Sequence, residues 1–201
     1  MGEPTRWVTD NPDTHSQSYV DHFRRLAAQG SDLGGEARLL DALVPPASHV
    51  LDAGCGTGRT GAVLHQRGHR VVGVDADPLL VAAAREDHAG PQWYVDDLSA
   101  LDLAAQGVSE PFDGAVMAGN VMVFVAPGTE RGVLGGIARH LAQGAPLVTG
   151  FATDRHYALV DFDDDAEAVG FCVEHRFATW DLRPYRADGD FAVTILRRLP
   201  G

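Results

Sequence analysis

The 201-residue sequence contains no lysine, and all 16 of its basic residues are arginine. The missing ε-amine excludes Schiff-base chemistry, pyridoxal phosphate attachment and a phosphate-binding loop that carries a lysine. The 28 acidic residues give a formal net charge of −12, so a nucleic-acid backbone would meet an unfavourable field. We therefore expect neither lysine chemistry nor bulk nucleic acid as a partner.

Cysteines and long apolar runs are also scarce. Cys55 and Cys172 are too few for a disulfide framework, and they form no zinc-binding spacing with the nine histidines. The longest apolar runs, near 114–126, are interrupted by Gly, Asn and Pro, so we expect no membrane-spanning helix and no membrane partner. The N-terminal residues lack an apolar signal core, which predicts a cytoplasmic protein.

The length suits one compact domain, because a chain of this size can bury roughly 70% of its unfolded surface. Helical periodicity at 16–29 and 36–44 predicts two amphipathic helices ahead of the core, and a pair of prolines ends the second. We therefore expect an N-terminal helical extension or lid over 1–45 and a main domain over 46–201.

The chain is organised around one glycine-rich stretch, residues 50–61. Two apolar residues lead to Asp52, glycines recur at positions 54, 56, 58 and 61, and a helical pattern follows. Glycine permits positive φ and lets the backbone approach a ligand where a Cβ would collide. A buried strand, an acid at its tip, a glycine turn and a helix together predict a cofactor-binding turn.

Strand-like and helical patterns alternate after this turn. Further strands are expected at 70–75, 91–95, 112–117 and 146–151, then as two runs at 171–179 and 190–197. A turn signal at 187–189 separates the last two runs and predicts a hairpin. The whole pattern predicts a doubly wound, mostly parallel α/β sheet of seven strands with an antiparallel C-terminal hairpin, helices on both faces, and ligands at the carboxyl ends of the strands.

Several polar residues are expected at helix starts. Asp77 followed by Pro78 is typical of an N-cap and the first helical position, and Thr129 is expected to cap a later helix. The acids 163–165 fit the first turn of a helix, where its dipole stabilises them, better than a metal site, so we expect no metal. The aromatics of 180–185 are expected to pack near the hairpin.

Carboxylates follow three successive strands, as Asp52, Asp75 and the pair Asp96 and Asp97. Residues 56–61 satisfy the dinucleotide fingerprint, with Asp75 nineteen residues after the first glycine, which is typical of a nicotinamide enzyme. That site requires neither Asp52 nor the acidic pair. A cofactor that joins adenosine to a zwitterionic amino acid would use both, with one carboxylate near its ammonium group and another near the adenine.

On these motifs the chain resembles the class I S-adenosylmethionine-dependent methyltransferases over about residues 45–151. The resemblance implies a Rossmann-like fold and S-adenosyl-L-methionine as cofactor. It implies that the glycine turn passes under the amino-acid part, that Asp75 holds the ribose hydroxyls, and that Asp97 and Leu98 frame the adenine, although Asp96 leaves this register open. The implied cofactor-binding residues are Asp52, Gly54, Cys55, Gly56, Gly58, Asp75, Ala76, Asp96, Asp97, Leu98, Ala118, Gly119 and Asn120.

No comparable motif identifies the methyl acceptor. The stretch 118–122 lacks the Asn/Asp-Pro-Pro-Tyr run that the resemblance would demand for methylating amino groups of nucleobases or glutamine, so we expect a small-molecule acceptor. Methyl transfer needs a general base only if the acceptor must lose a proton. The residues expected on the acceptor side are Asn120, Phe124, Asp154, Arg155, His156, Tyr157, Tyr19 and His22, with His156 as a possible base.

The sequence leaves two other functions open besides a methyltransferase. One is an NAD(P)-dependent oxidoreductase that uses the same glycine turn. The other is a protein that binds S-adenosylmethionine without turnover. The cofactor distinguishes the first alternative, and turnover distinguishes the second.

Overall fold

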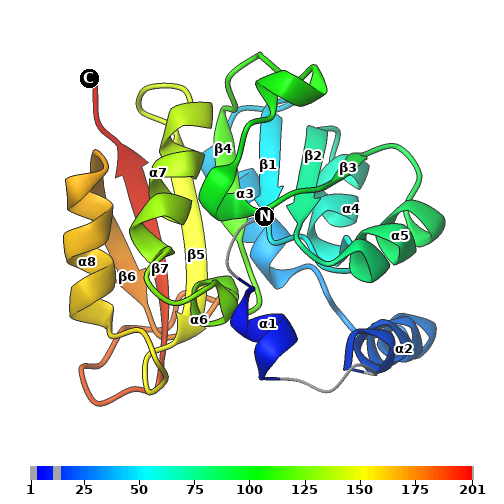
Figure 1. Ribbon diagram of the computed structural model, residues 1–201, viewed down its shortest axis with the longest axis horizontal. Coiled ribbons are helices and arrows are strands. Elements are labelled where there is room, and N and C mark those ends of the chain that lie inside the picture. Colours follow the sequence, from blue (N-terminus) through cyan, green and yellow to red (C-terminus); the bar gives the residue numbers. More distant parts are fainter. Residues whose placement is uncertain (1–3, 11–14, 201) are drawn as a thin grey trace.

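The computed structural model describes residues 4–10 and 15–200 of the chain. One seven-stranded sheet with the order β3-β2-β1-β4-β5-β7-β6 forms its centre (Figure 1). The strands are β1 (His49–Ala53), β2 (Arg70–Asp75), β3 (Gln92–Val95), β4 (Gly114–Met117), β5 (Pro146–Ala152), β6 (Phe171–Phe177) and β7 (Phe191–Arg198). The first five strands are parallel, and β7 runs antiparallel to both β5 and β6. The predicted doubly wound sheet is confirmed.

Helices connect the strands and precede the sheet. The α-helices are α1 (Arg6–Thr9), α2 (His15–Ala28), α3 (Gly35–Leu43), α4 (Arg59–Gln66), α5 (Pro78–Asp87), α6 (Val121–Phe124), α7 (Glu130–His140) and α8 (Leu159–Ala168). Two short 3-10 helices, η1 (Leu98–Ala100) and η2 (Ala104–Gln106), follow β3. The predicted cap of α5 is present, since the Asp77 carboxylate accepts hydrogen bonds from the backbone N–H groups of Leu79 and Leu80.

The sheet is covered on both faces, as its apolar strands require. Leu51 packs in the cluster that includes α7 and α8, whereas its neighbour Val50 packs in the cluster that includes α3 and α4. Successive side chains of a strand point to opposite faces, so one strand contributes to both layers. The carboxyl ends of β1 to β4 are thereby held in one rigid row.

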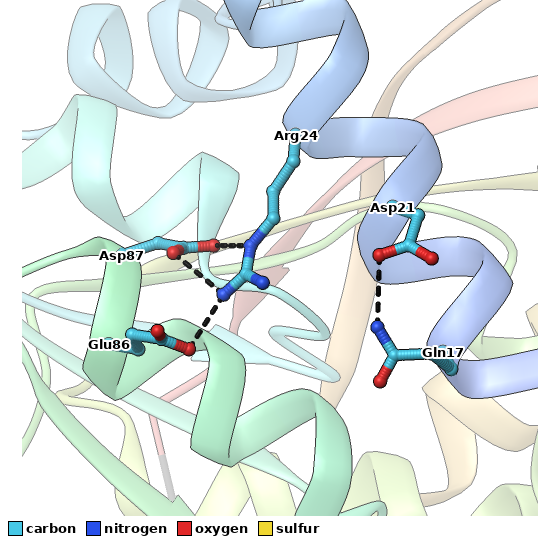
Figure 2. Close-up of polar contacts among 5 residues, drawn as sticks. All are labelled: Gln17, Asp21, Arg24, Glu86 and Asp87. Carbon is cyan, nitrogen blue, oxygen red and sulfur yellow. Dashed lines mark hydrogen bonds and ion pairs between the residues drawn. The ribbon is translucent and has the colours of Figure 1, made fainter.

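The N-terminal helices lie across the carboxyl edge of this row. Figure 1 shows α1 beside α6, and the Arg6 guanidinium donates to the Val125 carbonyl oxygen and pairs with Glu130 at 3.3 Å. Figure 2 shows Arg24 of α2 reaching Glu86 and Asp87 at the end of α5, each at 2.8 Å. The N-terminal segment is therefore tied to both sides of the sheet edge.

Three local expectations are corrected. Residues 178–190 connect β6 to β7, so the turn at 186–189 belongs to a long loop and does not form a tight hairpin. The Thr129 hydroxyl makes no side-chain cap and donates to the Ala126 carbonyl oxygen. The acids 163–165 lie beyond the first turn of α8, where Asp163 pairs with Arg176 and Asp165 with Arg131, so ion pairs rather than the helix dipole explain them.

Other expectations concern the chain ends and the loop between the last strands. Trp180 packs against the cluster on the α3 side, with its ring over Gly150, as the expected packing near the hairpin requires. Within the described ranges, 4–10 and 15–200, no helix is long and apolar enough to cross a membrane. Residues 1–3 lie outside the described residues, so the location predicted from the N-terminal sequence stays a prediction.

Candidate functional site

A cavity partly open to solvent lies at the carboxyl ends of β1 to β4, with about 730 Å³ of empty space when that open solvent is included. Its floor comes from the strand ends, and its roof comes from α1, α2 and α6. The lining residues are Thr5, Trp7, Val8, Tyr19, Gly54, Gly56, Asp75, Ala76, Asp77, Leu80, Asp97, Leu98, Ala118, Gly119, Val121, Phe124 and Val125.

The glycine turn has the backbone conformation that its sequence predicts. Gly54, Gly56 and Gly58 all adopt positive φ, and the first two line the cavity. A Cβ at Gly54 would lie 2.4 Å from a methyl carbon of Val121, a distance at which something must shift. Only glycine therefore keeps this part of the cavity open for a ligand.

The first acid, Asp52, supports the turn from below and does not line the cavity. Its carboxylate is 1% exposed and accepts a hydrogen bond of 2.8 Å from the Gly61 backbone N–H. Burial raises its pKa to about 7, and the bond from Gly61 only partly opposes this. The structure thus places Asp52 under the turn, not at the cavity surface where a ligand's ammonium group would meet it.

Two other residues of the predicted set also lie beneath the surface. Cys55 packs with Val81, Ala84 and Trp93, and the Trp93 ring fills the space that a Cβ at Gly58 would occupy, at 2.9 Å. Trp93 is a buried residue of β3 that the sequence reasoning did not single out. The size of the Trp93 ring explains why glycines face it, because a side chain on the turn would overlap with the ring.

The second acid, Asp75, lines the cavity at the end of β2. One carboxylate oxygen accepts from the Gly56 backbone N–H at 2.8 Å and the other from the Asp77 backbone N–H at 2.9 Å. Burial raises its pKa to about 6, with these two bonds opposing the shift. The Ala76 backbone N–H also interacts with this carboxylate, which has about four acceptor positions in all, so Asp75 can still accept a hydroxyl donor of a bound ligand.

The acidic pair after β3 is divided between two environments. Asp97 and Leu98 line the cavity, and the Asp97 carboxylate caps η1 by accepting from the Ser99 backbone N–H at 2.9 Å. Asp96 does not line it, and its carboxylate accepts from the Gln106 side-chain amide at 2.7 Å. Geometry therefore favours the register in which Asp97 faces the ligand.

The predicted floor after β4 is divided in the same way. Ala118 and Gly119 line the cavity. Asn120 does not, because its side-chain oxygen accepts from the Ala152 backbone N–H at 2.8 Å and ties the loop to the end of β5. Asn120 has a φ of 66°, and α6 begins at the next residue.

Most of the residues predicted on the acceptor side do not line the cavity. Tyr19 and Phe124 line the cavity, but the residues after β5 do not. His156 is exposed, and Tyr157 is buried with its hydroxyl donating to Asp165 at 2.8 Å. His22 is exposed on α2, and Arg155 pairs loosely with Asp154 at 3.7 Å. The side chains of the residues after β5 and of His22 turn into the core or into solvent and do not line the cavity, so their acceptor-side roles stay predictions.

The roof contains residues that the sequence reasoning missed. Trp7 and Val8 come from α1, a helix of four residues without an apolar period that could have predicted it. The Trp7 indole N–H lies 3.0 Å from an Asp77 carboxylate oxygen and 3.2 Å from the Ser16 hydroxyl. The Ser16 hydroxyl also donates to Asp77, so this carboxylate connects α1 and α2 to the start of α5.

The titratable side chains that line the cavity are acidic groups and one phenol. Among the residues that the structure describes, they are Tyr19, Asp75, Asp77 and Asp97. Burial raises the pKa of Tyr19 above its usual value, with the nearby Arg59 guanidinium opposing the shift. Over residues 4–10 and 15–200, no group of three or more His, Cys, Asp and Glu side chains could hold a metal ion.

Comparison with known proteins identifies the fold and its family. A family profile described as a methyltransferase domain matches residues 50–144. A solved TehB-like S-adenosylmethionine-dependent methyltransferase from Corynebacterium glutamicum is 40% identical to the chain, with a TM-score of 0.85 over 93% of this chain and 100% of that one.

Two curated relatives match over shorter stretches. A malonyl-[acyl-carrier protein] O-methyltransferase from Pectobacterium atrosepticum is 44% identical over 69 residues, which cover 33% of this chain and 27% of the relative. A ribosomal protein L11 methyltransferase from Symbiobacterium thermophilum is 35% identical over 109 residues, or 53% of this chain and 35% of the relative. The chain thus spans about a third or less of the length of these relatives.

The glycine turn, the strand-end acids, the sheet order and the similarity over the full length of a solved methyltransferase agree. They decide the choice of cofactor that the glycine turn alone left open. The chain belongs to the class I S-adenosylmethionine-dependent methyltransferases, a family of enzymes whose cosubstrate is S-adenosyl-L-methionine.

Proposed function

We propose that this chain transfers the methyl group of S-adenosylmethionine to a small-molecule acceptor that binds between the strand ends and the N-terminal helices. The observation that carries the proposal is the roofed cavity, because α1 and α2 cover the sheet edge where the donor would lie. A covered chamber suits a small acceptor better than a broad macromolecular surface.

The strand-end residues fit the donor group by group. Gly54 and Gly56 leave a cradle that a Cβ would narrow, and the amino-acid part of the donor would lie over it. Asp75 would accept the ribose hydroxyls, and Asp97 with Leu98 would border the adenine. Ala118 and Gly119 would lie beneath the sulfur, while Asp52, Cys55 and Gly58 would hold the turn in shape.

The relatives' names do not decide the acceptor. The curated matches are a methyltransferase named for a malonyl group on a carrier protein and one named for a ribosomal protein, and both matches cover a minor part of those proteins. The roof residues Trp7 and Val8 lie outside the family profile, which begins at residue 50. The roof residues of this chain are therefore the part of the cavity that would determine which acceptor binds.

The chemistry asks the protein mainly for alignment. Methyl transfer from a sulfonium is an in-line displacement, and holding two reactants in place can contribute about 7–11 kcal/mol. Gly56 and Asp75 would fix the donor while Trp7, Tyr19 and Phe124 would bound the acceptor. These groups would also exclude water from the reacting atoms.

Ligand-induced stabilisation tests the proposal. At about 100 times its dissociation constant, S-adenosylhomocysteine adds about 2.7 kcal/mol to the free energy of unfolding, which raises Tm by several degrees. We expect this shift with S-adenosylhomocysteine and none with NAD at the same concentration. A shift with NAD alone would contradict the proposal, and turnover of S-adenosylmethionine with a defined acceptor separates an enzyme from a binding protein.

A further inference from the structure

The roof of the cavity is aromatic. Trp7, Tyr19 and Phe124 all line it, and the Trp7 ring lies 5.2 Å from the Tyr19 ring and 5.4 Å from the Phe124 ring, centroid to centroid. Both pairs are edge to face, with interplanar angles of 86° and 89°. Three rings from three helices, α1, α2 and α6, therefore meet where the acceptor would bind.

The titratable side chains that line the cavity around these rings are acids and one tyrosine. In the described part of the chain, the cavity lining contains carboxylates but no arginine or histidine side chain. Two arginines lie close to the cavity without lining it, and Arg59 interacts with the Tyr19 hydroxyl, but each arginine also has a carboxylate partner. Arg6 pairs with Glu130 and donates to the Val125 carbonyl oxygen, and Arg59 pairs with Glu36 at 2.5 Å and donates to the Leu33 carbonyl oxygen.

This combination disfavours an anionic acceptor. A carboxylate or phenolate brought into the chamber would lose its water and meet Asp75, Asp77 and the negative faces of the rings. Its charge would be compensated by the sulfonium of the donor but by no arginine or histidine among the described lining residues. A cation or a developing positive charge is attracted to ring faces and to the same carboxylates. The chamber is therefore suited to positive charge on the acceptor side.

The described cavity lining contains no histidine. His156 and His22 are exposed away from the cavity, and the His15 ring packs 4.5 Å from the Trp7 ring, centroid to centroid, without lining the cavity. Asp77 is occupied as the cap of α5 and the partner of Trp7, and burial raises the pKa of Tyr19, which keeps the phenol protonated at neutral pH. The lining carboxylates Asp75 and Asp97 are the ones that we assign to the ribose and adenine of the donor, so no described lining group is left to take a proton from the acceptor.

We propose that the acceptor is a neutral lone-pair nucleophile, an amine nitrogen or a thioether sulfur, whose methylated product is a cation held by Trp7, Tyr19 and Phe124. This inference rests on the proposed function. The acceptor's lone pair forms the new bond to the methyl carbon as the carbon–sulfur bond of the donor breaks. The electron pair of that bond stays on the donor sulfur, so the positive charge passes to the acceptor.

The roof then stabilises the positive charge that moves from the donor to the acceptor during the reaction. The sulfonium charge moves from the donor toward the aromatic rings as the new bond forms, and interactions that strengthen in the transition state raise the rate. An ammonium product that carries a proton loses it to water after release. A tertiary amine or a thioether leaves as a permanent cation, and no step needs a protein base.

Three probes of similar shape test the charge preference in the full chain saturated with S-adenosylhomocysteine. Choline is cationic, 3,3-dimethyl-1-butanol is its neutral counterpart and 3,3-dimethylbutanoate is anionic. We expect calorimetry to show choline binding about 5 to 30 times more tightly than the alcohol, as about 1–2 kcal/mol of cation–π attraction implies. The anion should bind most weakly.

The variant Phe124→Leu keeps an apolar side chain and removes one ring. With the variant also saturated with S-adenosylhomocysteine, we expect its preference for choline over the alcohol to be at least about threefold smaller than that of the wild type. Equal binding of choline and the alcohol by the wild type, or tighter binding of the anion, would overturn the inference. Wild-type chain that fails to bind S-adenosylhomocysteine would instead overturn the proposed function.

Turnover then separates the two kinds of acceptor. A panel of small amines, thioethers, phenols and carboxylates is supplied with S-adenosylmethionine at several pH values. Amine methylation should rise with pH through the amine's own pKa, whereas thioether methylation should not follow an acceptor pKa. Turnover confined to phenols or carboxylates would contradict the inference, and if no compound is turned over, the binding order of the three probes decides.

Discussion

The two halves of the cavity depend on different kinds of sequence information. The strand-end half consists of the glycine turn and the acids after β2 and β3, each following directly from a strand of the parallel sheet. The roof half consists of side chains from α1, α2 and α6, which meet only after the chain has folded. Local sequence therefore specifies the donor side, and long-range packing specifies the acceptor side.

We expect the largest effect from a substitution in the strand-end half, at Gly54. In Gly54→Ala the new Cβ meets Val121 at 2.4 Å in a backbone with a φ of 74°, so the turn must move. We expect S-adenosylhomocysteine affinity to fall at least about 30-fold, because a displaced turn loses contacts to the ligand worth about 2 kcal/mol. Calorimetry measures the change.

A matched glycine supplies the control for this substitution. Gly107 also has positive φ, 85°, but a Cβ there would have nothing within 4 Å. Gly107→Ala should lose stability through backbone strain yet bind S-adenosylhomocysteine like the wild type. Equal losses of affinity in both variants would show that the space at Gly54 is not what the ligand needs.

The second prediction concerns Asp52 beneath the turn. Its folded-state pKa of about 7 lies above the ordinary value of 3.8, so the folded state holds the proton more tightly than the unfolded state. Stability should therefore fall as pH rises from about 4 to 7. Asp52→Asn cannot ionise, so between pH 5 and 8 its stability relative to the wild type should rise by up to about 2–3 kcal/mol.

Urea unfolding at pH 5 and pH 8 measures this difference. The asparagine oxygen can still accept from the Gly61 N–H, so the turn keeps its support. A constant difference between the two proteins across this range would show that Asp52 ionises at its ordinary pKa.

The third prediction compares two acids at neighbouring strand ends. Asp75→Ala should weaken S-adenosylhomocysteine binding at least about tenfold, because it removes a charged acceptor worth roughly 1.5–3 kcal/mol. Asp96→Ala should change affinity less than about twofold, because the Asp96 carboxylate faces Gln106 rather than the cavity. Similar losses in both variants would contradict the assigned register.

The smallest effect is expected in the roof, at the contact shown in Figure 2. Arg24 bridges α2 to Glu86 and Asp87, but its side chain is 41% exposed and solvent screens the pairs. Arg24→Ala should lower Tm by about 2 °C or less, with a smaller effect at high salt. Affinity for S-adenosylhomocysteine should not change, and a tenfold loss would mean that the roof and the donor half are coupled.

The parts of the fold that were predictable have local causes. β2 has the predicted bounds because a run of apolar residues ends on Asp75, and α5 starts where predicted because Asp77 caps it and Pro78 has no N–H to leave unpaired. The glycine turn was predictable because its glycines follow directly after β1 at a recognisable spacing, although the side chains that crowd Gly54 and Gly58, Val121 and Trp93, are distant in the sequence.

The parts that were not predictable depend on distant neighbours. Tyr157 was expected at the cavity, but its ring packs beside those of Phe151 and Phe162, at 6.0 and 6.3 Å between centroids, and no local pattern shows which way that loop turns. Trp7 reaches the cavity because Asp77, seventy residues later, accepts its indole N–H. Such contacts become visible only in three dimensions.

The division of the cavity into a donor half and an acceptor half can be tested directly by a crystal structure of the chain with S-adenosylhomocysteine. We expect the ribose at Asp75, the adenine beside Asp97 and Leu98, and the sulfur open to the space bounded by Trp7, Tyr19 and Phe124. A ligand whose sulfur points away from these three rings, or one bound outside this cavity, would contradict the division.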